Sequence, residues 1–278
     1  MTNLEPIERL SRDLAKAASL LSPSEARYLV DAYYTIQEYR KASGNQILAL
    51  SKSGEPHEVI QWLGTQMGGL EGQIKRALDK WTDEQDLGRW AKSICGIGPV
   101  ITAGLLSHID IGKAPTVGHI WRFAGLDPTL KWNKGEKRPW NASLKTLCWK
   151  IGESFVKVSG NANDFYGKLW LQRKEIEVRK NEAGDFAAQA VAVLLAKKMR
   201  KDTEAIKWYT QGKLPPAQIH ARAKRWAVKL FLAHYHHVGY WLKFNREPPK
   251  PYVISILGHV DMIGPPNFSH GKGETHPA

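Results

Sequence analysis

Residues 90–110 read WAKSICGIGPVITAGLLSHID, two apolar helix-forming stretches separated by Gly-Ile-Gly-Pro. Gly96 and Gly98 allow positive φ, and Pro99 suits the first turn of a helix because its missing N–H would be unpaired there. The stretch therefore predicts two short helices joined by a tight turn, a helix–hairpin–helix motif. Free N–H groups at the start of the second helix can bind a phosphate without reading a base. The alternative is a turn that only folds the chain.

Apolar residues on either side of this turn recur with helical periodicity, which predicts an all-α fold. Residues 1–86 predict an N-terminal helical hairpin or coiled coil that mediates self-association. Residues 87–250 predict a basic helical domain that contains the turn, and residues 251–278 a C-terminal extension that is largely disordered. The heptad stripe behind the coiled-coil prediction consists of Ile60, Leu63, Met67, Leu70, Ile74 and Leu78.

Positive charge is concentrated in the second half of the chain. The net charge is +13. Residues 111–250 contain 27 Lys and Arg against 11 Asp and Glu, whereas residues 1–110 contain 12 against 14. A surface that only improves solubility would be spread more evenly, so this asymmetry is typical of polyanion binding. We therefore expect DNA as the partner, with a structured RNA as a second candidate, and a homodimer or higher homo-oligomer as the assembly.

Several classes of protein are not indicated by the sequence. The N-terminus lacks the apolar core of a signal peptide, and no stretch is apolar enough to span a membrane. Cys95 and Cys148 fit neither a zinc site nor a disulfide framework, and Cys148 has core neighbours. We therefore expect no membrane, no cofactor and no metal. The expected location is cytoplasmic and nucleoid-associated, in a prokaryote or phage.

Two further segments combine cations with aromatic residues. KWNKGEKRPW, residues 131–140, can contact phosphates and stack on unpaired bases, or its tryptophans can anchor the loop to the core. HARAKRW, residues 220–226, begins a helix whose cations can follow a DNA backbone or form an ordinary exposed face. With the turn and the helix after the loop, the predicted DNA-binding residues are Lys92, Gly96, Ile97, Gly98, Val100, Lys131, Trp132, Lys134, Lys137, Arg138, Lys145, Arg222, Lys224 and Arg225.

Two groups of residues could in principle bind a metal. His234 and His237 lie three apart on one helix, but no acidic or cysteine ligand is near in sequence, so aromatic packing is favoured. The second group is acidic and alternates with Arg and Lys, which favours an exposed, salt-bridged helix. Its members are Glu175, Glu177, Glu182 and Asp185.

Three segments together resemble a known family. They are SICGIGPVITAGLLSHID, HIWRFAGLDPTLKWNKGEK and the late helix HARAKRWAVKLFLAHYHH. They resemble the C-terminal domain of the IS one-ten / one-sixteen group of insertion-sequence transposases, which are guided by a bridge RNA. The resemblance covers roughly the second half of the chain and implies DNA binding and DNA recombination.

The chain departs from that family in two ways. The family has an N-terminal resolvase-like (DEDD) nuclease domain with four acidic residues, whereas the first ninety residues here are helical without such a motif. The family's serine nucleophile corresponds to a position near Asn133, and asparagine cannot act as that nucleophile. Ser143 is an alternative only under a shifted alignment. The resemblance therefore supports DNA binding more than strand transfer.

The sequence favours a sequence-tolerant DNA-binding protein related to these transposases, without strand-transfer chemistry of its own. One alternative is an active transposase or recombinase that works with a partner. Another is a helix–hairpin–helix DNA-modifying enzyme, in which base excision would need an acidic residue after the hairpin, and Asp127, which follows a Gly-Leu turn, is the nearest candidate. A third is a protein whose basic half docks an acidic partner protein.

Overall fold

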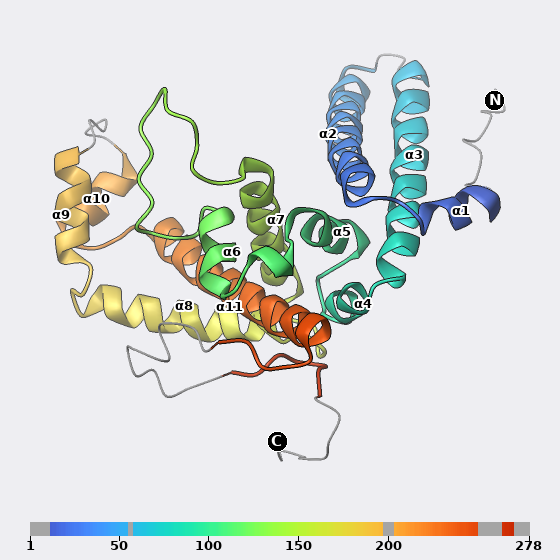
Figure 1. Cartoon of the computed structure of the whole chain (residues 1–278). Coiled ribbons are helices and arrows are strands. Elements are labelled where there is room, and N and C mark those ends of the chain that lie inside the picture. The colour runs from blue at the N-terminus through green and yellow to red at the C-terminus, as the bar shows by residue number, and fades with distance from the viewer. Residues whose placement is uncertain (1–11, 55–57, 197–202, 250–262, 270–278) are drawn as a thin grey trace. The chain divides into compact units, whose positions relative to one another are not determined.

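Every regular element is helical in the part of the chain that the computed structural model describes, residues 12–54, 58–196, 203–249 and 263–269 (Figure 1). The predicted all-α fold is therefore confirmed. None of the helices in these ranges is both long enough and apolar enough to cross a membrane. The predicted C-terminal extension lies outside the described residues, apart from residues 263–269, and so does the start of the first predicted helix.

The chain divides into two compact units. The first comprises residues 1–93 and 97–113, and the second residues 94–96 and 114–278. The boundary expected between residues 86 and 87 lies inside the first unit, because the two helices that flank the glycine turn pack against the N-terminal hairpin.

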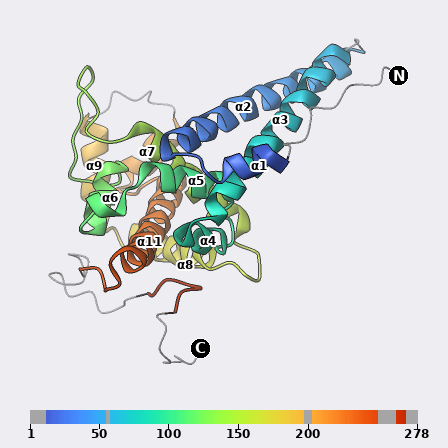
Figure 2. The same cartoon turned by 45° about the vertical axis from the view of Figure 1, so that its right-hand side comes forward.

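The first unit is built on a long antiparallel pair, α2 (Pro23–Ser53) and α3 (Glu58–Asp83), which lie side by side in both views (Figures 1 and 2). α1 (Arg12–Ala18) packs against α3. α4 (Asp86–Lys92) and α5 (Pro99–His108) follow, and a 3₁₀ turn, η1 (Ile111–Lys113), ends the unit. The core shared by α2, α3 and α5 consists of Ala26, Val30, Ile74, Leu78, Trp81, Val100 and Ala103.

The heptad stripe on α3 is only partly used within the unit. Ile74 and Leu78 are buried, whereas Leu63 and Leu70 remain 39% and 42% exposed. Between α2 and α3 the buried Glu71 accepts hydrogen bonds from Gln37 Nε2 at 2.9 Å and Arg40 Nε at 2.6 Å. A buried carboxylate costs free energy unless its partners are aligned, so this network favours one register of the hairpin. The predicted self-association of residues 1–86 stays a prediction.

The second unit is organised around α11 (Pro216–Phe244), against which α6 (Val117–Phe123), α7 (Ala142–Val158) and α8 (Tyr166–Glu182) pack (Figure 1). α9 (Ala187–Ala196) and α10 (Glu204–Thr210) pack against each other. The aromatic centre of the unit stacks Phe155 on Tyr166 with 4.8 Å between ring centroids, and Phe231 lies edge-on to both. A satellite cluster consists of Phe186, Ala190, Tyr209, Leu214 and Ile219.

The histidines of α11 are used for packing and hydrogen bonding. His234 is buried between the Tyr166 hydroxyl, 2.7 Å from its Nδ1, and the Ile263 carbonyl, 2.7 Å from its Nε2. Because a carbonyl can only accept, Nε2 carries the proton and Nδ1 accepts from Tyr166. Burial lowers the pKa of His234 to about 4. His237 contacts Glu247. The described residues contain no group of three or more His, Cys, Asp or Glu placed to hold a metal ion.

The prediction of a uniformly exposed, salt-bridged helix at residues 175–185 is wrong for Glu177, which is only 2% exposed. Its carboxylate accepts hydrogen bonds from Arg173 and, across to α11, from Arg222. Burial raises the pKa of Glu177, but the bonds from Arg222 and Arg173 outweigh it, so the pKa lies below its ordinary value. The sequence pattern showed the neighbour on the same helix, whereas the partner on α11 is 45 residues away.

Candidate nucleic-acid interface

The glycine turn joins α4 and α5 as expected, with residues 93–98 between them. Gly96 has φ +90, and a Cβ there would lie 3.1 Å from Ser154 Oγ, so both backbone and space favour glycine. Of the two glycines that allow positive φ, only Gly96 uses it, since the φ of Gly98 is −95. Gly98 is instead the N-cap of α5, and no side chain caps that end. The first N–H groups of α5 therefore have no partner from a capping side chain.

The apolar residues of the turn point into the protein. Ile97 and Val100 are buried, so these two predicted residues can offer only backbone groups to a ligand. Gly98 is half-buried, and a Cβ added to it would meet nothing within 4 Å. Any contact between the turn and a phosphate would therefore run through backbone N–H groups around residue 98.

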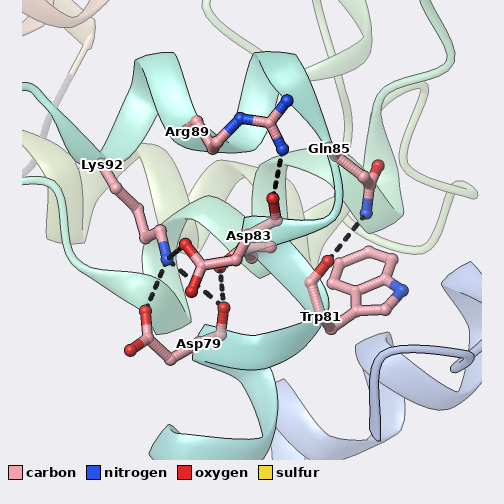
Figure 3. Close-up of polar contacts among 7 residues, drawn as sticks. Asp79, Trp81, Asp83, Gln85, Arg89 and Lys92 are labelled. Carbon is pink, nitrogen blue, oxygen red and sulfur yellow. Dashed lines mark hydrogen bonds and ion pairs between the residues drawn. The ribbon is translucent and has the colours of Figure 1, made fainter. Parts of the chain in front are cut away.

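Lys92, the predicted cation closest to the turn, is already neutralised (Figure 3). Its Nζ lies 2.6 Å from Asp79 Oδ1 and also pairs with Asp83, and its side chain is 16% exposed. Burial lowers its pKa, but the two carboxylates raise it by more, so the ammonium stays charged and paired. Asp79 and Asp83 lie on one face of α3, four residues apart. The ammonium therefore joins α3 to α4, and Lys92 is a poor candidate for a phosphate contact.

The segment AGLDP, which carries much of the family resemblance, has a structural explanation. Gly125 has φ +65 and ends α6 in a Schellman motif, in which Leu126 N donates to Trp121 O and Gly125 N to Arg122 O. Asp127 Oδ1 then accepts from the backbone N and the hydroxyl of Thr129, at 2.9 and 2.7 Å. These bonds lower the pKa of Asp127. The segment thus stops α6 and directs the loop that follows.

The loop between α6 and α7 extends away from the helices of the second unit (Figure 1). Its tip is stabilised from within, because Trp132 Nε1 donates to Glu136 O at 2.8 Å. Asn133 donates from its backbone N and from Nδ2 to the Glu136 carboxylate, each at 3.1 Å. Asn133 therefore holds the turn at the tip of this loop together. Ser143 lies exposed in the first turn of α7, and none of the described side chains hydrogen-bonds to it.

The two tryptophans of the loop have different environments. Trp140 packs beside Gly125, where a Cβ would approach its ring to 2.8 Å, and Lys145 Nζ lies 4.0 Å from its ring centroid. Trp132 lies edge-on to Trp140 at 6.3 Å, carries Arg138 at 5.4 Å, and is 37% exposed. Trp140 therefore anchors the loop, and Trp132 presents a face to solvent.

Six predicted cations form what we call the basic surface. All six are exposed, and none makes an ion pair with a carboxylate in the described part of the chain. They are Lys131, Lys134, Lys137, Arg138, Lys145 and Arg225. Burial, and then the charges of Arg138 and Arg225, lower the pKa of Lys145. Burial, and then the charge of Arg222, lower the pKa of Arg225. Lys145 is therefore repelled by Arg138 and Arg225, whereas the charge of Glu177 acts in the opposite direction on Arg225.

The other predicted cations on α11 are compensated. Arg222 pairs with Glu177 at 2.7 Å and lies 4.3 Å over the Phe186 ring. Lys224 pairs with Glu153, and its stem lies along Gly152, where a Cβ would be 2.6 Å from Lys224 Cγ. Only Arg225 of the predicted α11 trio therefore belongs to the basic surface.

Trp149 is a feature of this region that is not among the predicted residues. It is 58% exposed on α7, one turn beyond Lys145, and Lys224 Nζ lies 5.5 Å from its ring. Its proximity in sequence to the buried Cys148 suggests core packing. The four-residue spacing from Lys145 is the signal that could have placed it on the exposed face.

Comparison of the chain with protein-family models, with curated proteins and with solved structures finds no match.

Proposed function

We propose that this chain is a sequence-tolerant DNA-binding protein that contacts the phosphate backbone with the basic surface of its second unit. The observation that carries the proposal is that Arg138 and Arg225 lie close enough to Lys145 to lower its pKa, while none of the three makes an ion pair with a carboxylate among the described residues. The fold pairs Lys92, Arg222 and Lys224 with carboxylates but leaves Lys145 repelled by Arg138 and Arg225. A bound phosphate would relieve that repulsion and gain charge-assisted hydrogen bonds.

The proposal includes binding and omits strand transfer. The Asn133 side chain is engaged by Glu136, and none of the described side chains hydrogen-bonds to Ser143. Asp127 is engaged by Thr129. The amide of Asn133 is not a nucleophile, and a serine nucleophile needs a base within hydrogen-bond reach, which none of the described hydrogen bonds gives Ser143. The relation to insertion-sequence transposases rests on the three sequence segments and remains part of the proposal.

The first prediction concerns the salt dependence of duplex binding. The triple variant Arg138→Gln, Lys145→Met and Arg225→Gln should bind a duplex about tenfold more weakly at physiological salt. A plot of log K against log salt concentration has a negative slope, and its magnitude should decrease by about 2.7. Each lost phosphate contact contributes roughly 0.9 to that slope. Fluorescence anisotropy titrations at several salt concentrations measure both quantities. The substitutions keep much of each side chain, so that packing around Trp140 is preserved.

The matched control is Lys75→Met, which removes an exposed cation from α3 in the first unit. It should leave both the affinity and the slope unchanged. Wild-type protein that fails to bind a duplex at low salt would contradict the proposed function. A flat salt dependence with tight binding to an acidic protein would favour the docking alternative instead.

The second prediction tests the glycine turn by itself. Gly98→Val places a side chain where nothing lies within 4 Å and where φ is accessible to any residue, so the fold should tolerate it. If backbone N–H groups at the start of α5 contact a phosphate, the added side chain blocks them. We expect duplex affinity to fall about threefold, in line with the strength of a helix-terminus contact. Anisotropy measures the affinity, and thermal unfolding checks the fold.

Gly96 is unsuitable for this test because its positive φ strains any other residue. Unchanged binding by a folded Gly98→Val protein would show that the turn only connects two helices. That result would leave the basic surface untouched, since Arg138, Lys145 and Arg225 belong to other elements.

A further inference from the structure

Resting on the proposed function, we infer that the substrate of the basic surface is single-stranded DNA, whose unpaired bases stack on Trp132 and Trp149. Cations alone would serve a duplex equally well. Exposed aromatic faces beside those cations can stack on an unpaired base. A base in a duplex cannot use this interaction, because its faces are already covered by the neighbouring bases in the stack.

The aromatic and basic side chains form a continuous track across three elements of the second unit. It starts at Trp132, 6.3 Å from Trp140, and passes to Lys145, 4.0 Å from the Trp140 ring. One turn further along α7 lies Trp149, and Lys224 of α11 lies 5.5 Å from its ring. The exposed rings of Trp132 and Trp149 are thus connected through Trp140 and Lys145, and Lys145 makes no ion pair with a carboxylate in the described part of the chain. This is the arrangement of surfaces that follow a strand by stacking its bases and pairing its phosphates.

Trp149 is more exposed than any other Phe, Tyr or Trp side chain in the described part of the second unit, including Phe123 and Phe244 at 43% and 39%. Phe155, Tyr166, Phe231 and Tyr235 are fully buried in the same unit, whereas Trp149 is more than half exposed. A free indole face costs solvation free energy unless a partner covers it. The neighbouring uncompensated cations point to an anionic partner, and an unpaired nucleotide is both anionic and flat. Charge complementarity therefore favours a nucleic-acid strand over an apolar protein surface.

Contacts within the second unit hold the aromatic rings of the track in place. The hydrogen bond from Trp132 Nε1 to Glu136 O holds the Trp132 indole in place. Gly125 has no side chain, which leaves room for Trp140 to pack against it. Lys224 is held by Glu153 beside Trp149. Because Lys224 is paired with Glu153, we do not expect it to contact a phosphate, although it lies next to the Trp149 ring.

The test compares a fluorescein-labelled oligo(dT) strand with a blunt duplex of equal length by anisotropy at one salt concentration. We expect the full chain to bind the strand more tightly. Trp149→Leu should weaken strand binding about tenfold and duplex binding less than twofold, and Trp132→Leu should act in the same direction. The matched control is Trp62→Leu, which removes a comparably exposed indole from α3 and should change neither affinity.

The outcomes separate this inference from the proposed function. A duplex preference with normal duplex affinity would overturn the single-strand inference and leave the DNA-binding proposal standing. Equal losses for strand and duplex in Trp149→Leu, or no loss in either, would also overturn it. Binding to neither probe would overturn both. Far-ultraviolet circular dichroism of each variant ensures that a loss is not a loss of fold.

Discussion

Gly167→Ala is expected to lower the free energy of unfolding by about 3 kcal/mol or more, the cost of forcing atoms into a filled backbone contact. Gly167 lies in the first turn of α8, where that helix crosses the end of α7. A Cβ there would lie 2.6 Å from Phe155 O and 2.8 Å from Ser159 Cα, and closer still to Asp164 Oδ2. Two of these three atoms are backbone atoms of α7 and its C-cap, so no rotation of a side chain can relieve the clash.

The same contact also secures the start of α8. Gly167 N donates to Asp164 Oδ1 at 2.9 Å, and Asp164 is only 4% exposed. Moving Asp164 to admit a methyl group would break this bond and leave a buried carboxylate unpaired, which adds to the cost. Thermal unfolding should show a fall in melting temperature of about 6 to 12 °C.

Gly160→Ala is the matched control for this prediction. Gly160 follows α7 directly, is exposed, and has no atom within 4 Å of an added Cβ. Its alanine variant should unfold within about 0.5 kcal/mol of the wild type. An equally small effect of Gly167→Ala would mean that α7 and α8 are not in close contact.

Stability is expected to fall steeply as the pH drops from about 6.5 towards 4, because His234 is buried as a neutral ring. The pKa of His234 is lowered to about 4 in the folded protein, whereas a free histidine has a pKa near 6.5. Between pH 6.5 and pH 4, His234 therefore binds a proton in the unfolded chain but stays neutral in the folded protein. The contribution of neutral His234 to the free energy of unfolding is fully present above pH 6.5. About 3 kcal/mol of it is lost by pH 4.

The physical reason lies in the surroundings of the ring. Protonation would place a charge among aromatic side chains and would give Nδ1 a proton, so that it could no longer accept from Tyr166. His236 acts in the same direction, since burial lowers its pKa as well, and its Nε2 contacts Ala114 O at 2.7 Å. Carboxylates with lowered pKa, such as Glu177, lose their contribution only below about pH 4.5.

Urea unfolding at intervals between pH 7 and pH 4.5 measures this dependence. In His234→Gln the slope of unfolding free energy against pH should be clearly smaller, even though the variant is less stable at pH 7. A wild-type stability that stays constant from pH 6.5 to 4.5 would contradict a neutral, buried His234.

Much of the fold could be predicted because helical periodicity is a local property. The heptad stripe from Ile60 to Leu78 indicated α3, and α2 begins after Ser22, which forms a capping box with Glu25. The glycine turn could be placed because glycine and proline restrict the backbone at their own positions. α10 was not predicted, since seven residues give too few repeats for a period to show.

The candidate site could be predicted only as a set of residue types. Cationic residues between 111 and 250 indicated an anionic partner, but every Lys and Arg in that range has the same charge in sequence. Lys92, Arg222 and Lys224 are compensated by Asp79, Glu177 and Glu153, which are distant along the chain or on other helices.

The sequence by itself determined the helical fold, the position of the glycine turn and the concentration of positive charge in the second half. Each of these follows from the intrinsic properties of neighbouring residues. Only the tertiary structure decided which cations stay unpaired, which tryptophan is exposed, and that the AGLDP segment ends a helix beside Trp140. Those outcomes depend on contacts between residues far apart in the chain. A carboxylate can neutralise a cation, and a ring can cover a glycine, only once the helices that carry them pack together.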